Sequence, residues 1–171
     1  MVVEMESKLT QSEYAKVTLK LTYKNIAVQL FTAVGVICMI LLLLQWFGLR
    51  KIFDTEAPMF PFLIATINIL LPFSVLGYAQ KHFASNLTLQ RSFKFVFDDE
   101  KISYFAEGDQ GQLNWEYVIK YSCINNFLLI YISNVSAYLI KTDELSDEQL
   151  NFIKSKIKQP EYHAKTNHQY N

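Results

Sequence analysis

The sequence has little glycine, proline or cysteine and no excess of charge of either sign. Among its 171 residues are 5 Gly, 4 Pro and 2 Cys, too few for a collagen-like or low-complexity chain or for a disulfide-rich scaffold. The 16 Lys and Arg residues balance the 16 Asp and Glu residues. This balance argues against a nucleic-acid partner, because a nucleic-acid-binding domain is normally basic.

Charge is missing altogether from two long stretches, Asn25–Leu49 and Ala57–Gln80. Each exceeds the roughly 20 apolar residues that cross a hydrocarbon core about 30 Å thick, and neither has the polar stripe of a soluble core helix. A signal peptide is the alternative for the first stretch, but a long segment of mixed charge precedes it and no small-residue cleavage pattern follows. We predict an integral membrane protein with transmembrane helices at 26–47 and 59–79.

A short connection joins the two predicted spans, so they form an antiparallel hairpin with both termini on one side. The flanking basic residues on that side are Lys16, Lys20 and Lys24 before the first span and Lys81, Arg91 and Lys94 after the second. The connection offers only Arg50 and Lys51, so the positive-inside rule predicts cytoplasmic termini. Lys81, Arg91 and Lys94 are also candidates for contact with anionic lipid.

Asn68 and Pro72 stand out within the second span. Proline cannot donate to residue i−4, so the Asn68 carbonyl is freed and a kink is expected. The Asn68 side chain has two interpretations, a local hydrogen bond near the kink or an interhelical hydrogen bond, such as one across a homodimer or other homo-oligomer. Neither span contains a charged residue, which speaks against a proton relay or a charged ion pathway.

After the second span the pattern changes to period two, which indicates β-strands. Leu87–Phe97 reads as the first strand, and later strands are expected at 102–107, 112–115, 117–124, 127–133 and 136–141. Residues 80–159 therefore predict one antiparallel meander of five or six strands with a closing helix, and 160–171 a flexible tail. At the other end, 1–25 predicts a short strand, Val2–Glu6, and an amphipathic helix, Gln11–Lys24, that runs straight into the first span.

Ser146 and Gln149 have the spacing of a helix capping box, which places the start of the closing helix. Leu150, Ile153 and Ile157 form one apolar stripe on that helix and are expected to pack on the sheet. The predicted core of the soluble part consists of Phe95, Trp115, Ile119, Leu150 and Ile153.

Several stretches together resemble a known family. They are Leu9-Thr10, Glu13-Tyr14, Phe97–Ile102, Leu113–Tyr121 with Trp115 and Ile119, Phe127–Tyr131 and Leu145–Phe152. With the two-span hairpin, this pattern is similar to the YcxB-like family of bacterial membrane proteins. The resemblance implies a cytoplasmic domain with the outline of a pleckstrin-homology (PH)-like barrel and no established activity. Tyr138–Lys141 lacks the proline that the family usually has in this region.

The sequence offers no constellation of catalytic residues. Cys38 falls in a predicted span and Cys123 in a predicted strand, and the histidines at 82, 163 and 168 match no metal-ligand spacing. We expect no metal, no cofactor and no enzymatic activity. The predicted function is that of a membrane-anchored protein in the bacterial inner membrane whose cytoplasmic domain binds a protein partner or lipid headgroups. The alternative is an immunity protein that neutralises a membrane-acting bacterial toxin, which would then be its partner.

Overall fold

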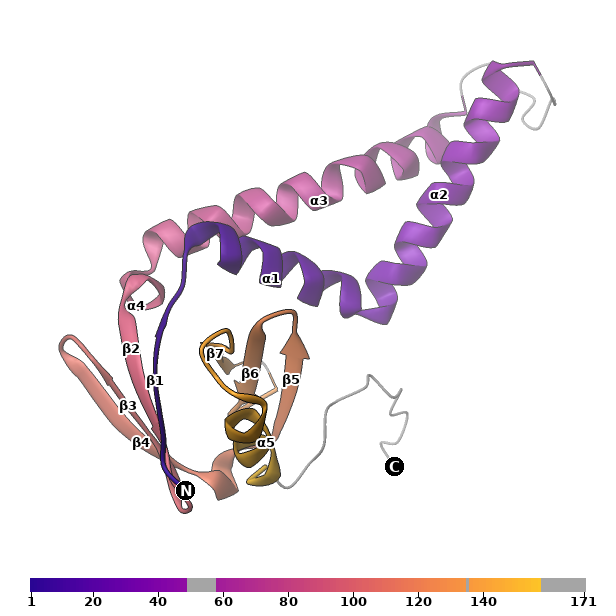
Figure 1. The fold of residues 1–171 in the computed structure, drawn as a ribbon. Helices are drawn as coiled ribbons and strands as arrows, with labels where there is room; N and C mark the ends of the chain where they lie inside the picture. The colour runs from indigo at the N-terminus through magenta and orange to yellow at the C-terminus, as the bar shows by residue number, and fades with distance from the viewer. Residues whose placement is uncertain (49–57, 135, 158–171) are drawn as a thin grey trace, which may run out of the picture. The chain divides into compact units, whose positions relative to one another are not determined.

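The computed structural model describes residues 1–48, 58–134 and 136–157 (Figure 1). The chain has an α+β fold and divides into two units. The helical unit is Gln11–His82, and the β unit combines Met1–Thr10 with the chain from Phe83 onward. The helical unit is thus inserted between the first strand and the rest of the β unit. The predicted connection with Arg50 and Lys51, and the predicted tail 160–171, lie outside the described residues.

In its described residues the helical unit contains α1 (Gln11–Lys24), α2 (Ile26–Trp46) and most of α3 (Met59–Ser85). The prediction that α1 runs straight into α2 is wrong. The chain breaks at Asn25, whose Oδ1 accepts a hydrogen bond from the Ala27 amide at 2.9 Å and so caps α2. Figure 1 shows the resulting change of direction between the two helices. By length and composition, α2 and α3 are both able to cross a membrane.

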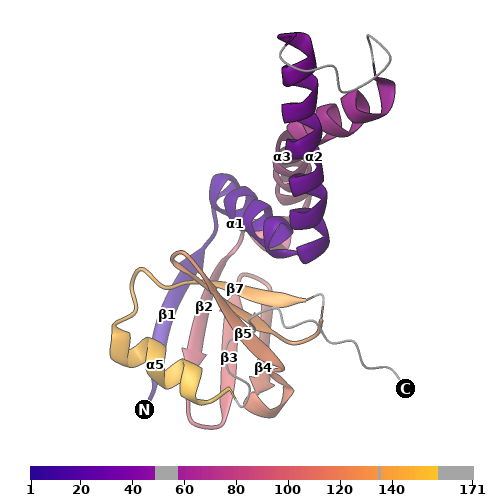
Figure 2. The same cartoon turned by 90° about the vertical axis from the view of Figure 1, so that its right-hand side faces the viewer.

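The described part of the β unit forms seven strands in two antiparallel sheets, where the sequence predicted five or six strands in one meander after the second span. The first sheet has the order β1 (Val3–Lys8), β2 (Ser92–Phe97), β3 (Lys101–Ala106) and β4 (Asp109–Asn114). The second has the order β5 (Lys120–Ile124), β6 (Phe127–Tyr131) and β7 (Ala137–Lys141). The sheets meet where the Ser7 Oγ of β1 accepts a hydrogen bond from the Lys141 amide of β7, at 3.1 Å. Figure 2 shows both sheets with the closing helix beside them.

The first predicted strand begins too early, because Leu87–Gln90 forms a short helix, α4. The Asn86 Oδ1 accepts from the Thr88 amide at 3.0 Å and caps this helix. The Gln90 side chain donates to the Phe83 carbonyl at 2.9 Å. These local side-chain bonds favour the turn over an extended strand, so strand β2 starts only at Ser92.

The predicted fourth strand is also shortened. Trp115–Tyr117 forms a single 3₁₀ turn, η1, and β5 follows at Lys120. After η1, Val118 is the buried residue, with 6% of its surface exposed, and Ile119 is 40% exposed. The expectation that Ile119 belongs to the core is therefore wrong by one position.

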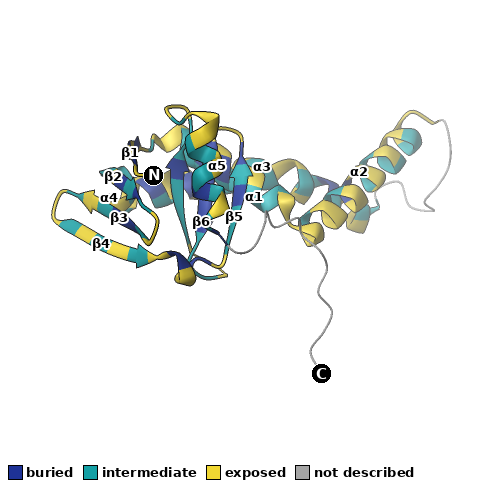
Figure 3. Cartoon of the chain, turned by 60° about the horizontal axis from the view of Figure 1, so that its bottom comes forward, coloured by how far each residue is buried: buried dark blue, intermediate teal, exposed yellow. Residues whose placement is uncertain are grey.

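The core of the β unit lies between its sheets and the closing helix α5 (Asp147–Ser155) (Figure 3). Phe95, Trp115 and Ile153 belong to this core, and Leu150 is partly buried against it. The capping box at the start of α5 is confirmed, because the Ser146 Oγ accepts from the Gln149 amide at 3.2 Å and the Gln149 Oε1 accepts from the Ser146 amide at 2.9 Å.

Candidate functional site

The helical unit has a polar crossing point, which consists of Thr32 and Gly35 on α2 and Asn68 on α3. Gly35 is buried, and a Cβ added there would overlap the Asn68 amide group. The glycine therefore lets the two helices approach closely, as small residues do between membrane helices. Of the two interpretations of Asn68, the local hydrogen bond is present, since its Nδ2 donates to the Ile64 carbonyl at 3.1 Å. The side chain also packs against Gly35 of the same chain, but its Oδ1 makes no interhelical hydrogen bond among the described residues.

Two oxygen atoms at the polar crossing are buried and lack a hydrogen-bond partner among the described residues. They are the Thr32 Oγ1 and the Asn68 Oδ1. Other hydroxyls in these helices donate to the carbonyl one turn earlier, as Thr66 does to Phe62 at 2.8 Å and Ser74 to Leu70 at 3.0 Å. The Thr32 hydroxyl makes no such hydrogen bond to a carbonyl of its own helix. Pro72 lies within α3 and has no amide hydrogen to offer the Asn68 carbonyl.

An apolar cavity of about 630 Å³ lies between α2 and α3. Its described lining consists of Met39, Leu42, Leu43, Gln45, Trp46, Pro58, Met59, Phe62, Ala65, Thr66 and Ile69. The volume falls in the range of small-molecule sites, but such sites normally add several convergent polar groups. The cavity therefore provides space without a recognisable chemistry.

Helices α1 and α3 are joined within the helical unit by polar contacts near the end of α3. The Tyr14 hydroxyl and the His82 Nδ1 lie 3.1 Å apart, and their rings stack with centroids 5.9 Å apart. The Tyr78 ring stacks on His82 as well, and the Gln11 side chain donates to the Gln80 carbonyl at 3.1 Å. These contacts fix the start of α1 beside α3.

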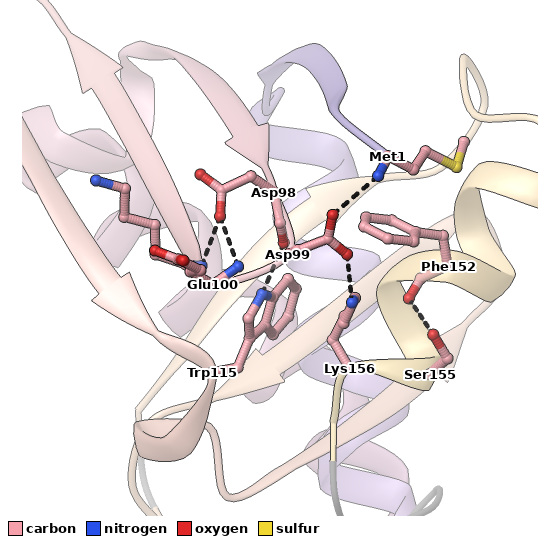
Figure 4. A network of polar contacts seen from close by, with 9 residues as sticks. Met1, Asp98, Asp99, Glu100, Trp115, Phe152, Ser155 and Lys156 are labelled. Carbon is pink, nitrogen blue, oxygen red and sulfur yellow. Dashed lines mark hydrogen bonds and ion pairs between the residues drawn. The ribbon is translucent and has the colours of Figure 1, made fainter.

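A polar network in the β unit surrounds the turn between β2 and β3 (Figure 4). The Asp99 carboxylate accepts from the Met1 amino group at 3.0 Å and from the Lys156 ammonium. Hydrogen bonds from Lys156 and then from the Met1 amino group hold the pKa of Asp99 below its ordinary value. In the same turn, the Trp115 Nε1 donates to the Asp98 carbonyl at 2.9 Å. Asp98 and Asp99 therefore have structural roles in this turn, because Asp98 Oδ1 accepts from the Glu100 and Lys101 amides and Asp99 binds two cationic groups.

Two tyrosines connect the sheets of the β unit. The rings of Tyr104 on β3 and Tyr138 on β7 have centroids 5.4 Å apart. Burial, followed by a hydrogen bond with Tyr104, raises the pKa of Tyr138 to about 12. Opposite Tyr104 in the β3–β4 register lies Gly111, where a Cβ would overlap the Tyr104 ring.

The basic residues predicted to contact lipid are dispersed over several elements. Lys81 is exposed on α3, Arg91 follows α4 and is half-buried, and Lys94 on β2 pairs with Glu4 of β1 at 2.7 Å. Cys38 and Cys123 are free thiols in different units. Among the described residues no group of three or more His, Cys, Asp or Glu side chains is placed to hold a metal ion.

Comparison with protein-family models, curated proteins and solved structures gives no significant match. Any function of these sites must therefore be inferred from their geometry. Sequence reasoning singled out Asn68 and missed Gly35 and Thr32, although a glycine and a hydroxyl three residues apart on one span are the kind of signal that marks a helix contact.

Proposed function

We propose that this is a two-span membrane protein that holds the β unit at the cytoplasmic face of a bacterial inner membrane, where that unit binds a protein partner without catalysing a reaction. The observation that carries the membrane assignment is the exposure of α2 and α3. Only 6% of the most apolar window of each helix is buried. A core helix of a soluble protein would be largely covered by its own chain, so these helices need an apolar environment from outside.

The sheet pairing argues against a cleaved signal sequence. Cleavage after α2 would remove β1, which pairs with β2 over the whole length from Val3 to Lys8. It would also remove Val3 and Met5, which are 0% and 6% exposed in the core. Loss of this strand would leave the edge of β2 unpaired. We therefore propose that α2 is retained in the mature protein.

The same pairing supports one side of the membrane for both flanks of the hairpin. Strand β1 precedes α2 and β2 follows α3, and a sheet forms only if both strands are on the same side. The distribution of lysine and arginine in the sequence makes this side the cytoplasm. We further propose that the β unit has the PH-like fold and that the chain is a YcxB-like protein, which agrees with strands followed by one closing helix.

The partner surface that we propose is an exposed apolar patch on the β unit, Tyr117 and Ile119. These side chains are 62% and 40% exposed. The cationic Lys120 next to them lies 4.9 Å from the centroid of the Tyr131 ring. Aromatic side chains are enriched at protein-binding surfaces relative to the rest of a protein surface, and this enrichment favours Tyr117 as the contact residue.

The membrane assignment is tested by alkaline extraction of cell membranes and by thiol labelling. The full chain should stay in the membrane pellet at high pH. In a background without Cys38 and Cys123, a cysteine at position 101 should react with an impermeant reagent only in inverted vesicles, and a cysteine at position 50 only in intact spheroplasts. Release of the chain at high pH, or labelling of both positions from one side, would contradict the assignment.

The partner assignment is tested by photo-crosslinking in cells. A photoreactive residue at Tyr117 should give one discrete crosslinked species, and the same residue at the exposed Gln110 serves as the control. The species should disappear when Ile119→Asp is added. Equal patterns at 117 and 110 would argue against a partner surface at this place.

A further inference from the structure

Helix α1 lies between the two ends of the membrane hairpin. Its first turn is held beside the end of α3 by the contacts of Gln11 with Gln80 and of Tyr14 with His82. Its last residue, Lys24, is connected through Asn25 to the start of α2. Figure 1 shows the triangle that α1, α2 and α3 enclose.

Helix lengths explain this triangle. With a rise of about 1.5 Å per residue, α1 is roughly 20 Å long. From the polar crossing of Gly35 and Asn68, α2 runs back about 14 Å to Ile26, and α3 runs on about 21 Å to His82. The two spans therefore separate by about the length of α1 on this side. Because both ends of α1 lie where the spans end, its axis runs across the bilayer normal, as in an interfacial helix.

One face of α1 is basic. Lys16, Lys20 and Lys24 follow one another at intervals of four residues, and all three are exposed. Residues at this spacing share a helix face. The single acid of α1 is Glu13 in the first turn, so the face has a net positive charge. Ala15, in contrast, is 2% exposed.

We propose that Lys16, Lys20 and Lys24 of α1 bind the headgroups of anionic phospholipids in the membrane that α2 and α3 span. This inference rests on the proposed membrane function and adds a ligand and a site to it. Long lysine side chains reach the phosphate layer from a helix that lies at the interface. A protein partner is less suited to this face, because the face is continuous with the spans and is therefore held at the depth of the headgroups.

The lysines of α1 fit this role better than Lys81, Arg91 and Lys94. The latter three belong to separate elements, α3, the end of α4 and β2, and so do not share one face. Lysines near an anionic leaflet each contribute about 1 kcal/mol, and contributions add most effectively where the charges lie along one face.

The test uses the full chain reconstituted in phosphatidylcholine vesicles that contain a minor fraction of phosphatidylglycerol. Spin-labelled phosphatidylglycerol and phosphatidylcholine report the relative association of each lipid with the protein. The wild-type chain should prefer phosphatidylglycerol, and high salt should weaken this preference. The triple variant K16Q/K20Q/K24Q should lose about fivefold in preference for each lysine removed, whereas K16R/K20R/K24R should retain it.

A matched variant, K94Q/K101Q/K120Q, removes the same charge from strands of the β unit and should keep the preference. Unchanged preference in K16Q/K20Q/K24Q would overturn the proposal, and so would an equal loss in both glutamine variants. Failure of the wild-type chain to enter the vesicles would instead contradict the proposed membrane function. Insertion without lipid preference would contradict only the α1 site.

Discussion

The side-chain amide of Asn68 on α3 occupies the space into which any other residue at Gly35 of α2 would place its Cβ. Glycine at position 35 is thus required by the neighbouring helix and not by its own backbone. The contact lies where α2 and α3 cross, so a change at either residue alters how these two helices pack.

Substitution of this glycine should destabilise the hairpin. Gly35→Ala forces the Asn68 amide out of its place, and we expect the free energy of unfolding in detergent to fall by about 1–3 kcal/mol. The control is Gly77→Ala on α3, where a Cβ meets nothing within 4 Å and alanine should be neutral or stabilising by up to about 1 kcal/mol. The double variant Gly35→Ala/Asn68→Ala should recover part of the loss; equal stability of the two single alanine variants would refute the close contact.

Removal of the Thr32 hydroxyl should not lower the free energy of unfolding. The hydroxyl is buried without a partner among the described residues, so Thr32→Val should leave stability unchanged or raise it by about 1 kcal/mol. Thr66→Val removes a hydroxyl that donates to the Phe62 carbonyl and should lower stability by about 0.5–1.5 kcal/mol. Thermal unfolding in detergent compares the two. A larger loss for Thr32→Val would mean that its hydroxyl bonds across the polar crossing.

The position of the core after η1 can be checked by alanine substitution. Val118→Ala removes buried methyl groups and should lower the free energy of unfolding by about 2 kcal/mol. Ile119→Ala should cost less than half as much, because Ile119 is 40% exposed. Trp115 fluorescence in a Trp46→Phe background measures both. The reverse order of the two losses would restore the sequence-based assignment of Ile119.

Asp99 should make the stability of the β unit depend on acid pH. Its hydrogen bonds with Lys156 and the Met1 amino group lower its pKa in the folded chain below 3.8. A depressed pKa gives stabilisation that is present above pH 3.8 and is lost as the pH falls through the folded-state pKa. Asp99→Asn should therefore be less stable than wild type at neutral pH, and the difference should vanish under acid conditions.

Thermal unfolding between neutral pH and pH 3 measures the difference, with Asp143→Asn at another exposed acid as the control. A difference between Asp99→Asn and wild type that stays constant over this range would show that the Asp99 contacts contribute nothing to folding.

Tyr138 should titrate at unusually high pH. Its folded-state pKa is raised to about 12 by burial and by the hydrogen bond with Tyr104. Because this value lies above the ordinary value of 10.0, the associated stabilisation is complete below pH 10 and is lost as the pH rises from 10 towards 12. Tyr104→Phe should lower the Tyr138 pKa, measured as the difference in phenolate absorbance from Tyr138→Phe. An unchanged titration would mean that burial alone raises the pKa.

Features that depend on local composition could be predicted from the sequence. Two long stretches without charge predict two apolar helices. The preference of such a segment for an apolar environment depends on its length and composition and not on its tertiary contacts. The capping box of Ser146 and Gln149 was likewise predictable, since its hydrogen bonds form within one helical turn. The turn at Asn125 follows from the same local rules, and this asparagine adopts φ 51°.

Other features could not be predicted from hydrophobicity and period. The strand pattern at Leu87–Gln90 was overridden by local side-chain bonds, including those of Gln90 to the end of α3, and the η1 turn moved the buried position from Ile119 to Val118. The pairing of β1 with β2 joins segments separated by the whole helical unit.

The sequence by itself determined that the chain has two long apolar helices and a β-rich remainder, because hydrophobicity and period are properties of neighbouring residues. Only the tertiary structure decided that Gly35 receives Asn68 and that α1 bridges the ends of the hairpin. Both depend on contacts between residues far apart in the chain, and no local pattern specifies which distant side chain fills a given space.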